Sequence, residues 1–80
     1  MKRREKVIRY QHHAEQRMAA RGIDKRQVEK VVRDPDTVRP ANRDNADRLE
    51  KAISRRRRLA VIASEHRSEF WIISAFWMSK

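Results

Sequence analysis

The spacing of apolar residues changes from a helical period to a period of two about halfway along the chain. Val28, Val31 and Val32 share one face of a predicted helix, because residues three and four apart lie on the same side of an α-helix. After residue 48 the pattern alternates, and the apolar runs 59–63 and 70–78 are typical of buried strands. Helices followed by strands predict an α+β domain.

Two N-terminal helices are predicted from their start and stop signals. Residues 12–21 are good or tolerated helix formers, and Gly22 supplies a C-terminal stop. Asp24 and Gln27 have the spacing of a capping box, so the second helix starts at Asp24. It ends ahead of Pro35, because the residue before a proline is driven out of the helical region.

The strands are expected to form a curled antiparallel sheet of three to four strands, with both helices packed on it. The alternating stretch and the two apolar runs form a meander, with turns at 55–58 and 65–68. Two further segments, Val7–Tyr10 and Thr37–Arg39, are short strand candidates, and the first of them suits a sheet edge.

The size of the chain limits it to one domain. Eighty residues support a single hydrophobic core, so we expect one domain over residues 1–80 and no internal cofactor cleft. The absence of cysteine excludes disulfides and cysteine-based zinc sites. The basic start lacks the apolar stretch of a signal peptide, and Phe70–Met78 is too short to cross a bilayer. We therefore expect a cytoplasmic protein without membrane contact.

The charge balance points to a polyanionic partner. The chain has 21 Lys and Arg residues against 11 Asp and Glu, a formal net charge of +10. Nucleic acid is favoured over membrane, because no predicted helix combines a broad apolar face with a basic one. The alternative is that the charge only keeps a small protein in solution.

The first predicted helix carries a basic stripe. His13, Arg17 and Arg21 recur every four residues and therefore share one side of the helix. An imidazole can move a proton near neutral pH, and guanidiniums stabilise charge on phosphate oxygens. The alternative is that the arginines are solvated or paired with Glu15 or Glu29, and that His13 is a cap or core residue.

A second basic cluster falls at a predicted turn. Arg55, Arg56, Arg57 and Arg58, together with Lys51 on the preceding strand, are candidates for contact with a nucleic-acid backbone. Basic turns also occur as solvated gatekeepers beside apolar strands, and that alternative stays open.

Aromatic residues gather in the last predicted strand. Strict alternation places Phe70, Ile72, Ser74 and Phe76 on one face of residues 70–78, and Trp71, Ile73, Ala75 and Trp77 on the other. Since two helices cover only one face, we predict partner binding around Trp71, Phe76 and Trp77. The alternative is a sheet that curls enough to enclose these rings in the core.

Metal and nucleotide-cofactor sites are not expected. The histidines and acidic residues lack metal-ligand spacing, and the single glycine excludes glycine-rich phosphate loops. The sequence around Ser74 is not that of a nucleophile elbow, so Ser74 is expected to be a polar residue of a strand.

The run HAEQRMAARGI at His13–Ile23, followed by the second-helix pattern of Asp24–Asp36, is the most specific motif in the chain. It resembles a family of small bacterial domains of unassigned function, grouped with RelE-like and BrnT-like toxins, over roughly residues 7–76. The run Ile72–Ala75 is also similar to the closing strand of BrnT-type toxins. The resemblance implies two N-terminal helices on a curled antiparallel sheet, and a metal-independent endoribonuclease held inactive by an antitoxin encoded beside it.

The resemblance also implies the roles of individual residues. His13 is the implied general acid or base, and Arg17 and Arg21 stabilise the phosphorane formed when an RNA 2′-hydroxyl attacks the adjacent phosphate. Ser74 matches the family position on the last strand, and Phe76 stands where many relatives have tyrosine or arginine. The alternative is a catalytically inactive basic module on the same fold. RNA, including ribosome-bound mRNA, and a cognate antitoxin are the expected partners.

Overall fold

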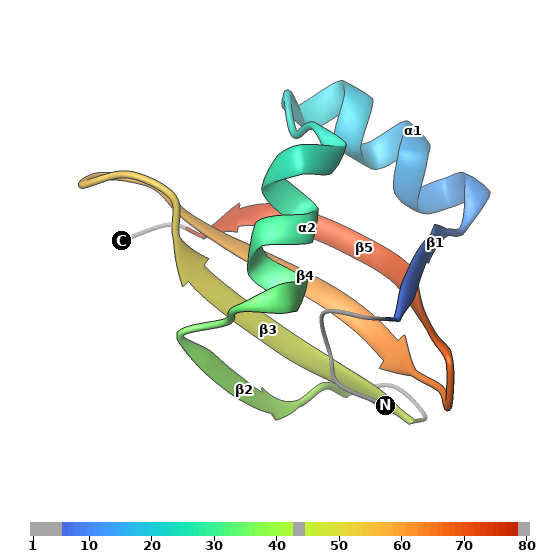
Figure 1. Cartoon of the computed structure of the whole chain (residues 1–80). Helices are drawn as coiled ribbons and strands as arrows, with labels where there is room; N and C mark the ends of the chain where they lie inside the picture. Colours follow the sequence, from blue (N-terminus) through green and yellow to red (C-terminus); the bar gives the residue numbers. More distant parts are fainter. Residues whose placement is uncertain (1–5, 43–44, 79–80) are drawn as a thin grey trace.

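Two helices and five strands make up residues 6–42 and 45–78, the part of the chain that the computed structural model describes (Figure 1). In chain order they are β1 (Val7–Tyr10), α1 (His12–Arg21), α2 (Lys25–Arg33), β2 (Thr37–Pro40), β3 (Ala46–Ala52), β4 (Arg58–Glu65) and β5 (Glu69–Met78). Neither helix within these residues is long and apolar enough to cross a membrane.

The strands form one mixed sheet in the order β1-β5-β4-β3-β2. β1 runs parallel to β5, and the other neighbouring pairs are antiparallel. The expected antiparallel sheet of three to four strands is therefore wrong. The difference arises because β1 pairs with the last strand, where Val7 lies opposite Glu69. A four-residue segment carries no local signal for so distant a partner or for its direction.

The helix boundaries follow the local signals in the sequence. Gly22 adopts the left-handed conformation with φ of 67°, and the next N–H, that of Ile23, donates to the Met18 carbonyl at 2.9 Å. The Asp24 carboxylate accepts from the Gln27 N–H at 2.9 Å, and the Gln27 side chain accepts from the Asp24 N–H. The predicted stop and capping box are thus confirmed.

Both helices lie on one face of the sheet, and the core fills the space between them (Figure 1). α1 contributes Ala14 and Met18, and α2 contributes its valine face. The sheet contributes a matching set of buried residues, which are Leu49, Leu59, Val61, Ala63, Phe70, Ile72 and Ala75. The other face carries no helix among the described residues, and we call it the helix-free face.

β5 contains an extra residue near its middle. Ile62 of β4 lies opposite Ser74, but the next residue, Ala63, lies opposite Ile72, so the register skips Ile73. Such a bulge reverses the alternation of the side chains beyond it, because two residues of one strand then oppose one position of its partner.

The bulge changes which side chains share a face. Ala75 and Trp77 pack with the core on the helix-covered side, whereas Trp71, Ser74 and Phe76 lie on the helix-free face. The strict alternation predicted for residues 70–78 is therefore wrong beyond Ile72. Periodicity could not show this, because nothing in an apolar run marks where a residue is skipped.

Candidate nucleic-acid interface

The basic stripe of α1 lies on the solvent side of that helix. Burial of Ala14 and Met18 against the sheet leaves His13 and Arg17 exposed. Arg21 differs from them, because its Nη1 donates to the Ala75 carbonyl of β5 at 2.8 Å. Among the described ion pairs none involves Arg17 or Arg21, so the pairing with acidic residues that the sequence left open is not found there.

Ser74 lies apart from the α1 stripe. It is 6% exposed, sits on the helix-free face, and is paired across the strands with Ile62. α1 packs on the opposite face, where its C-terminal end reaches β5 through Arg21. The structure therefore brings Arg21 to β5 but does not bring Ser74 to His13 or Arg17, and the catalytic role of these residues stays a prediction.

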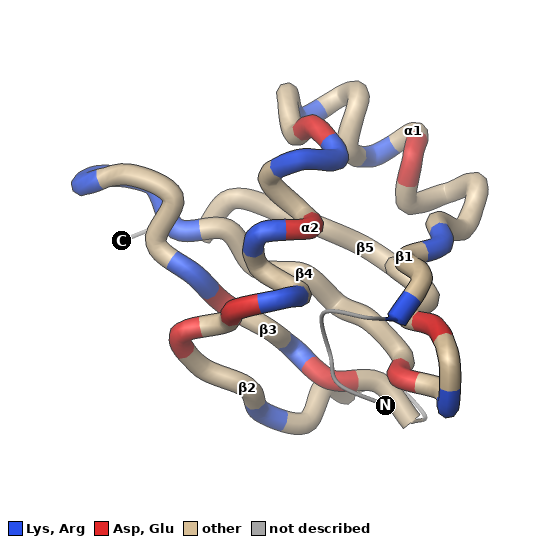
Figure 2. Tube along the Cα trace, in the orientation of Figure 1, with Lys and Arg blue, Asp and Glu red and all other residues tan. Residues whose placement is uncertain are grey.

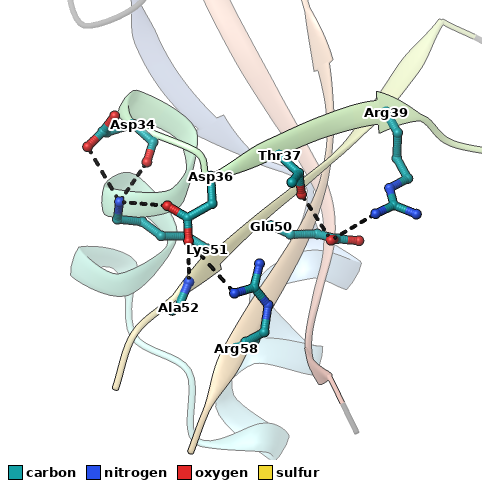
Figure 3. Close-up of polar contacts among 8 residues, drawn as sticks. All are labelled: Asp34, Asp36, Thr37, Arg39, Glu50, Lys51, Ala52 and Arg58. Carbon is teal, nitrogen blue, oxygen red and sulfur yellow. Dashed lines mark hydrogen bonds and ion pairs between the residues drawn. The ribbon is translucent and has the colours of Figure 1, made fainter. Parts of the chain in front are cut away.

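Lys51 and Arg58, two of the predicted nucleic-acid contacts, take part in an ion-pair network with acidic residues (Figure 3). The Lys51 Nζ donates to the Asp34 carbonyl at 2.8 Å and lies 3.5 Å from Asp36 Oδ1. Arg58 Nη1 lies 3.8 Å from Asp36 Oδ2. A hydrogen bond from the Ala52 N–H, with these two cations, lowers the pKa of Asp36. The network offsets both positive charges and leaves them less available to a ligand.

Arg55, Arg56 and Arg57 have a different setting. All three are exposed in the turn between β3 and β4, where the Ile53 N–H donates to the Arg57 carbonyl at 2.9 Å. The Arg57 guanidinium lies 3.6 Å from the centroid of the Trp77 ring. The indole N–H of Trp77 in turn donates to the Arg21 carbonyl at 2.9 Å. Trp77 thus joins the turn to the C-terminal end of α1.

α2 adds two further cations to this region. Arg26 and Lys30 line a shallow pocket of about 490 Å³ together with Ile53, which leads into the arginine turn. Asp24 also lines the pocket, and one of its carboxylate oxygens accepts the capping hydrogen bond. We call this region the basic end, and it consists of Arg21, Arg26, Lys30, Arg55, Arg56 and Arg57.

Charge is unevenly distributed over the molecule (Figure 2). Several carboxylates elsewhere are paired with cations: Glu15 lies 3.0 Å from Lys25, Glu65 lies 2.5 Å from Lys6, and Glu69 pairs with Arg9. In the described part of the chain, the six cations of the basic end form no ion pair with a carboxylate. Among the described residues, the basic end therefore gathers six cations without ion-pair partners, with the Asp24 carboxylate beside Arg26 and Lys30.

The aromatic residues predicted to bind a partner do not form one surface. Trp77 contacts the basic end and packs against the core, while Trp71 and Phe76 lie on the helix-free face. All three side chains are partly exposed. They therefore divide between two surfaces, and full enclosure of the rings by a curled sheet is not observed.

A buried carboxylate on the helix-free face escaped the sequence reasoning. Glu50 is 3% exposed and accepts a hydrogen bond from Thr37 at 3.0 Å (Figure 3). It accepts another from Arg48 at 2.6 Å. Arg39 lies 3.4 Å away. Burial would raise the pKa of Glu50, but these hydrogen bonds and the arginine charges outweigh it and lower the pKa. The alternation of Arg48 and Glu50 with apolar Leu49 was the available signal.

Arg26 and Lys30 were also missed, although their spacing of four residues on a predicted helix marks one exposed side. No group of three or more potential metal ligands is found among the residues that the structure describes.

A family model for a domain of unknown function, DUF4258, matches residues 10–77. The chain belongs to this family. The match covers all described helices and strands except the first three residues of β1 and the last residue of β5. Searches of curated proteins and of solved structures find no match. Membership of a family of unassigned function is therefore confirmed, and a kinship of DUF4258 with RelE-like or BrnT-like toxins remains a proposal.

Proposed function

We propose that this DUF4258 domain binds RNA through its basic end. The observation that supports the proposal is a set of six cations without ion-pair partners among the described residues: Trp77 joins Arg21 to the arginine turn, and Ile53 joins that turn to Arg26 and Lys30. Lysine and arginine side chains release counterions from a phosphate backbone when they bind it, and this release drives association. Arginine adds planar donors that match phosphate oxygens.

The proposal is tested with a matched pair of charge substitutions. Arg56 and Arg67 are both exposed, and they lie in the turns at opposite ends of β4. Arg56→Ser and Arg67→Ser remove the same charge, but only the first changes the basic end. Binding of a fluorescent oligouridylate is measured by anisotropy over a series of salt concentrations.

We expect Arg56→Ser to weaken binding and to reduce the slope of log K against log salt by about 0.7, the value for one lost contact with single-stranded nucleic acid. Arg67→Ser is expected to leave the slope close to that of the unaltered protein. Equal effects of the two substitutions would show that net charge, and not the basic end, carries the binding. Equal affinity for a DNA oligonucleotide of the same length would argue against RNA as the specific partner.

A toxin-type endoribonuclease is the second candidate function, and the exposure of His13 and Arg17 favours it. Both lie on the side of α1 that leads to Arg21, one helical turn beyond Arg17. RNA bound at the basic end would extend along this stripe, where His13 accepts or donates a proton. The 2′-hydroxyl gives up its proton and its oxygen attacks phosphorus, the bond to the 5′-oxygen breaks, and that oxygen takes up a proton. One of these two proton transfers is made by His13 and the other by water, and the products are a cyclic phosphate and a free 5′-hydroxyl. A cognate antitoxin would then be the protein partner.

Incubation of the purified protein with labelled single-stranded RNA in EDTA, with and without ribosomes, separates the two functions. Cyclic-phosphate products would support the endoribonuclease. Binding without cleavage in either condition would leave the RNA-binding module as the function.

A further inference from the structure

The helix-free face of the sheet carries two clusters with the same chemical composition. Each cluster contains an aromatic ring of β5, an arginine from another strand, and a carboxylate that holds the arginine in place. Neither cluster belongs to the basic end. We infer that this face is a second RNA surface, which stacks bases on the two rings; the inference rests on the proposed RNA binding and assigns it an additional site.

The first cluster forms where β1 meets β5. Arg9 lies opposite Trp71 in the parallel register, and its Nε donates to the Glu69 carboxylate. The other oxygen of Glu69 accepts from the indole N–H of Trp71 at 3.2 Å. Glu69 therefore fixes both the guanidinium and the ring edge, which leaves the remaining N–H groups of Arg9 for a ligand. The Arg9 side chain is 54% exposed, so a ligand can reach it.

The second cluster lies across β3 and β5. The Arg48 guanidinium is 5.1 Å from the centroid of the Phe76 ring, and its Nε donates to buried Glu50. Glu50 also accepts a hydrogen bond from Thr37 and forms an ion pair with Arg39, whose side chain is 62% exposed. Burying the carboxylate of Glu50 costs desolvation free energy, which apolar residues in place of the ion pair would avoid. Its position beneath two guanidiniums assigns Glu50 a positioning role, with Arg39 and Arg48 offering their remaining donors to phosphate.

The two rings are placed to contact different bases. Trp71 and Phe76 lie on one face of one strand, roughly 15 Å apart at ~3.3 Å per residue. The side chains between and beside them on β4 are small or aliphatic: Ala60, Ile62 and Ser64. No helix among the described residues covers this face. Stacking on aromatic rings and on guanidinium planes is how single-stranded nucleic acid is bound without sequence readout.

RNA is favoured over an acidic peptide because of what the clusters present. The first cluster pairs one arginine with one carboxylate, and the second pairs two arginines with one carboxylate, so charge alone gives only a weak attraction for a merely acidic chain. Each cluster combines an aromatic ring with a guanidinium, and such planar groups suit stacked bases better than they suit carboxylates.

The chain carries its own reporters for the two surfaces. It has two tryptophans: Trp71 on the helix-free face and Trp77 at the basic end. Protein labelled with fluorotryptophan gives one fluorine NMR signal for each indole, and Trp71→Phe assigns them. The probe is an oligouridylate of about ten nucleotides, within the range of single-strand site sizes.

We expect both fluorine signals to shift when the oligouridylate is added. Phe76→Leu, which keeps an apolar side chain but removes the ring, should weaken binding roughly 5- to 150-fold, the range for loss of one stacked base. Val38→Ala is the matched control, because Val38 is exposed on β2 opposite core residue Leu49, away from the helix-free face. It should leave affinity unchanged. Glu50→Gln removes a negative charge, which by charge alone would strengthen RNA binding at low salt. We expect the folded variant to bind more weakly than the unaltered protein at low salt as well, because the orientation of Arg48 is lost.

The outcomes separate this inference from the proposed function. A shift of the Trp77 signal alone, with unchanged affinity for Phe76→Leu, would overturn the second surface and leave binding at the basic end intact. Absence of any shift and of any anisotropy change would overturn both. A shift of the Trp71 signal by an acidic peptide and not by oligouridylate would identify a protein partner in place of RNA.

Discussion

Replacement of Glu50 by glutamine tests whether an ionised carboxylate holds β2 and β3 together. The substitution keeps the shape of the side chain and one carbonyl acceptor, so the Thr37 hydroxyl retains a partner. It removes the negative charge that faces Arg48 at 2.6 Å and Arg39 at 3.4 Å. Because Glu50 is 3% exposed, water cannot replace the lost interaction.

The expected loss of stability follows from the exposure of the partners. Removing one member of a buried ion pair costs about 3–5 kcal/mol. Arg39 is 62% exposed and contributes little, while Arg48 is 33% exposed and its bond is partly screened. We therefore expect a loss of about 2 kcal/mol in the free energy of unfolding, or about 8–16 °C in Tm for a domain of this size.

The pH dependence gives a second measurement. The pKa of Glu50 is lower in the folded protein than its ordinary value of 4.5. Its stabilising contribution is therefore complete above that value and is lost as the pH falls through the lower folded pKa. Urea unfolding of both proteins should show a difference that is constant above about pH 5 and shrinks at lower pH.

Glu15→Gln is the matched control for this measurement. Glu15 pairs with Lys25, and the two side chains are 46% and 58% exposed, so its loss should cost no more than about 0.5 kcal/mol. Equal losses for the two substitutions would refute the reasoning. So would a difference for Glu50→Gln that persists unchanged to pH 3.

Two further substitutions test the α1 stripe and the start of α2. His13→Ala should abolish RNA cleavage in EDTA, since an acid–base residue typically contributes ~10²–10⁴-fold to the rate. The variant should stay folded because His13 is exposed on α1. Full activity of the folded variant would show that His13 is not catalytic. Asp24→Ala should lower the free energy of unfolding by about 1 kcal/mol, because the Gln27 N–H loses its acceptor. Unchanged urea unfolding of Asp24→Ala would show that the cap contributes nothing.

Sequence alone was sufficient where neighbours along the chain decide the structure. The left-handed turn at Gly22, the capping box of Asp24 and Gln27, and the buried valine face of α2 are settled within about one helical turn. The apolar run 59–63 likewise predicts a buried strand whatever its partners are. The net charge of +10 also follows from composition, although its location does not.

Residues far apart in the chain decided the rest. Strand register decides three features: the parallel pairing of β1 with β5, the residue skipped in β5, and the hydrogen bond from Thr37 to Glu50. Register places hydrogen-bonding groups from separate segments side by side, and a shift of one residue moves every side chain beyond it to the other face. The sequence by itself therefore determined the helices, the buried strands and the amount of charge. Only the tertiary structure decided that Trp71 and Phe76 share a face and that Trp77 joins the basic end, because these relations exist only once distant strands are paired.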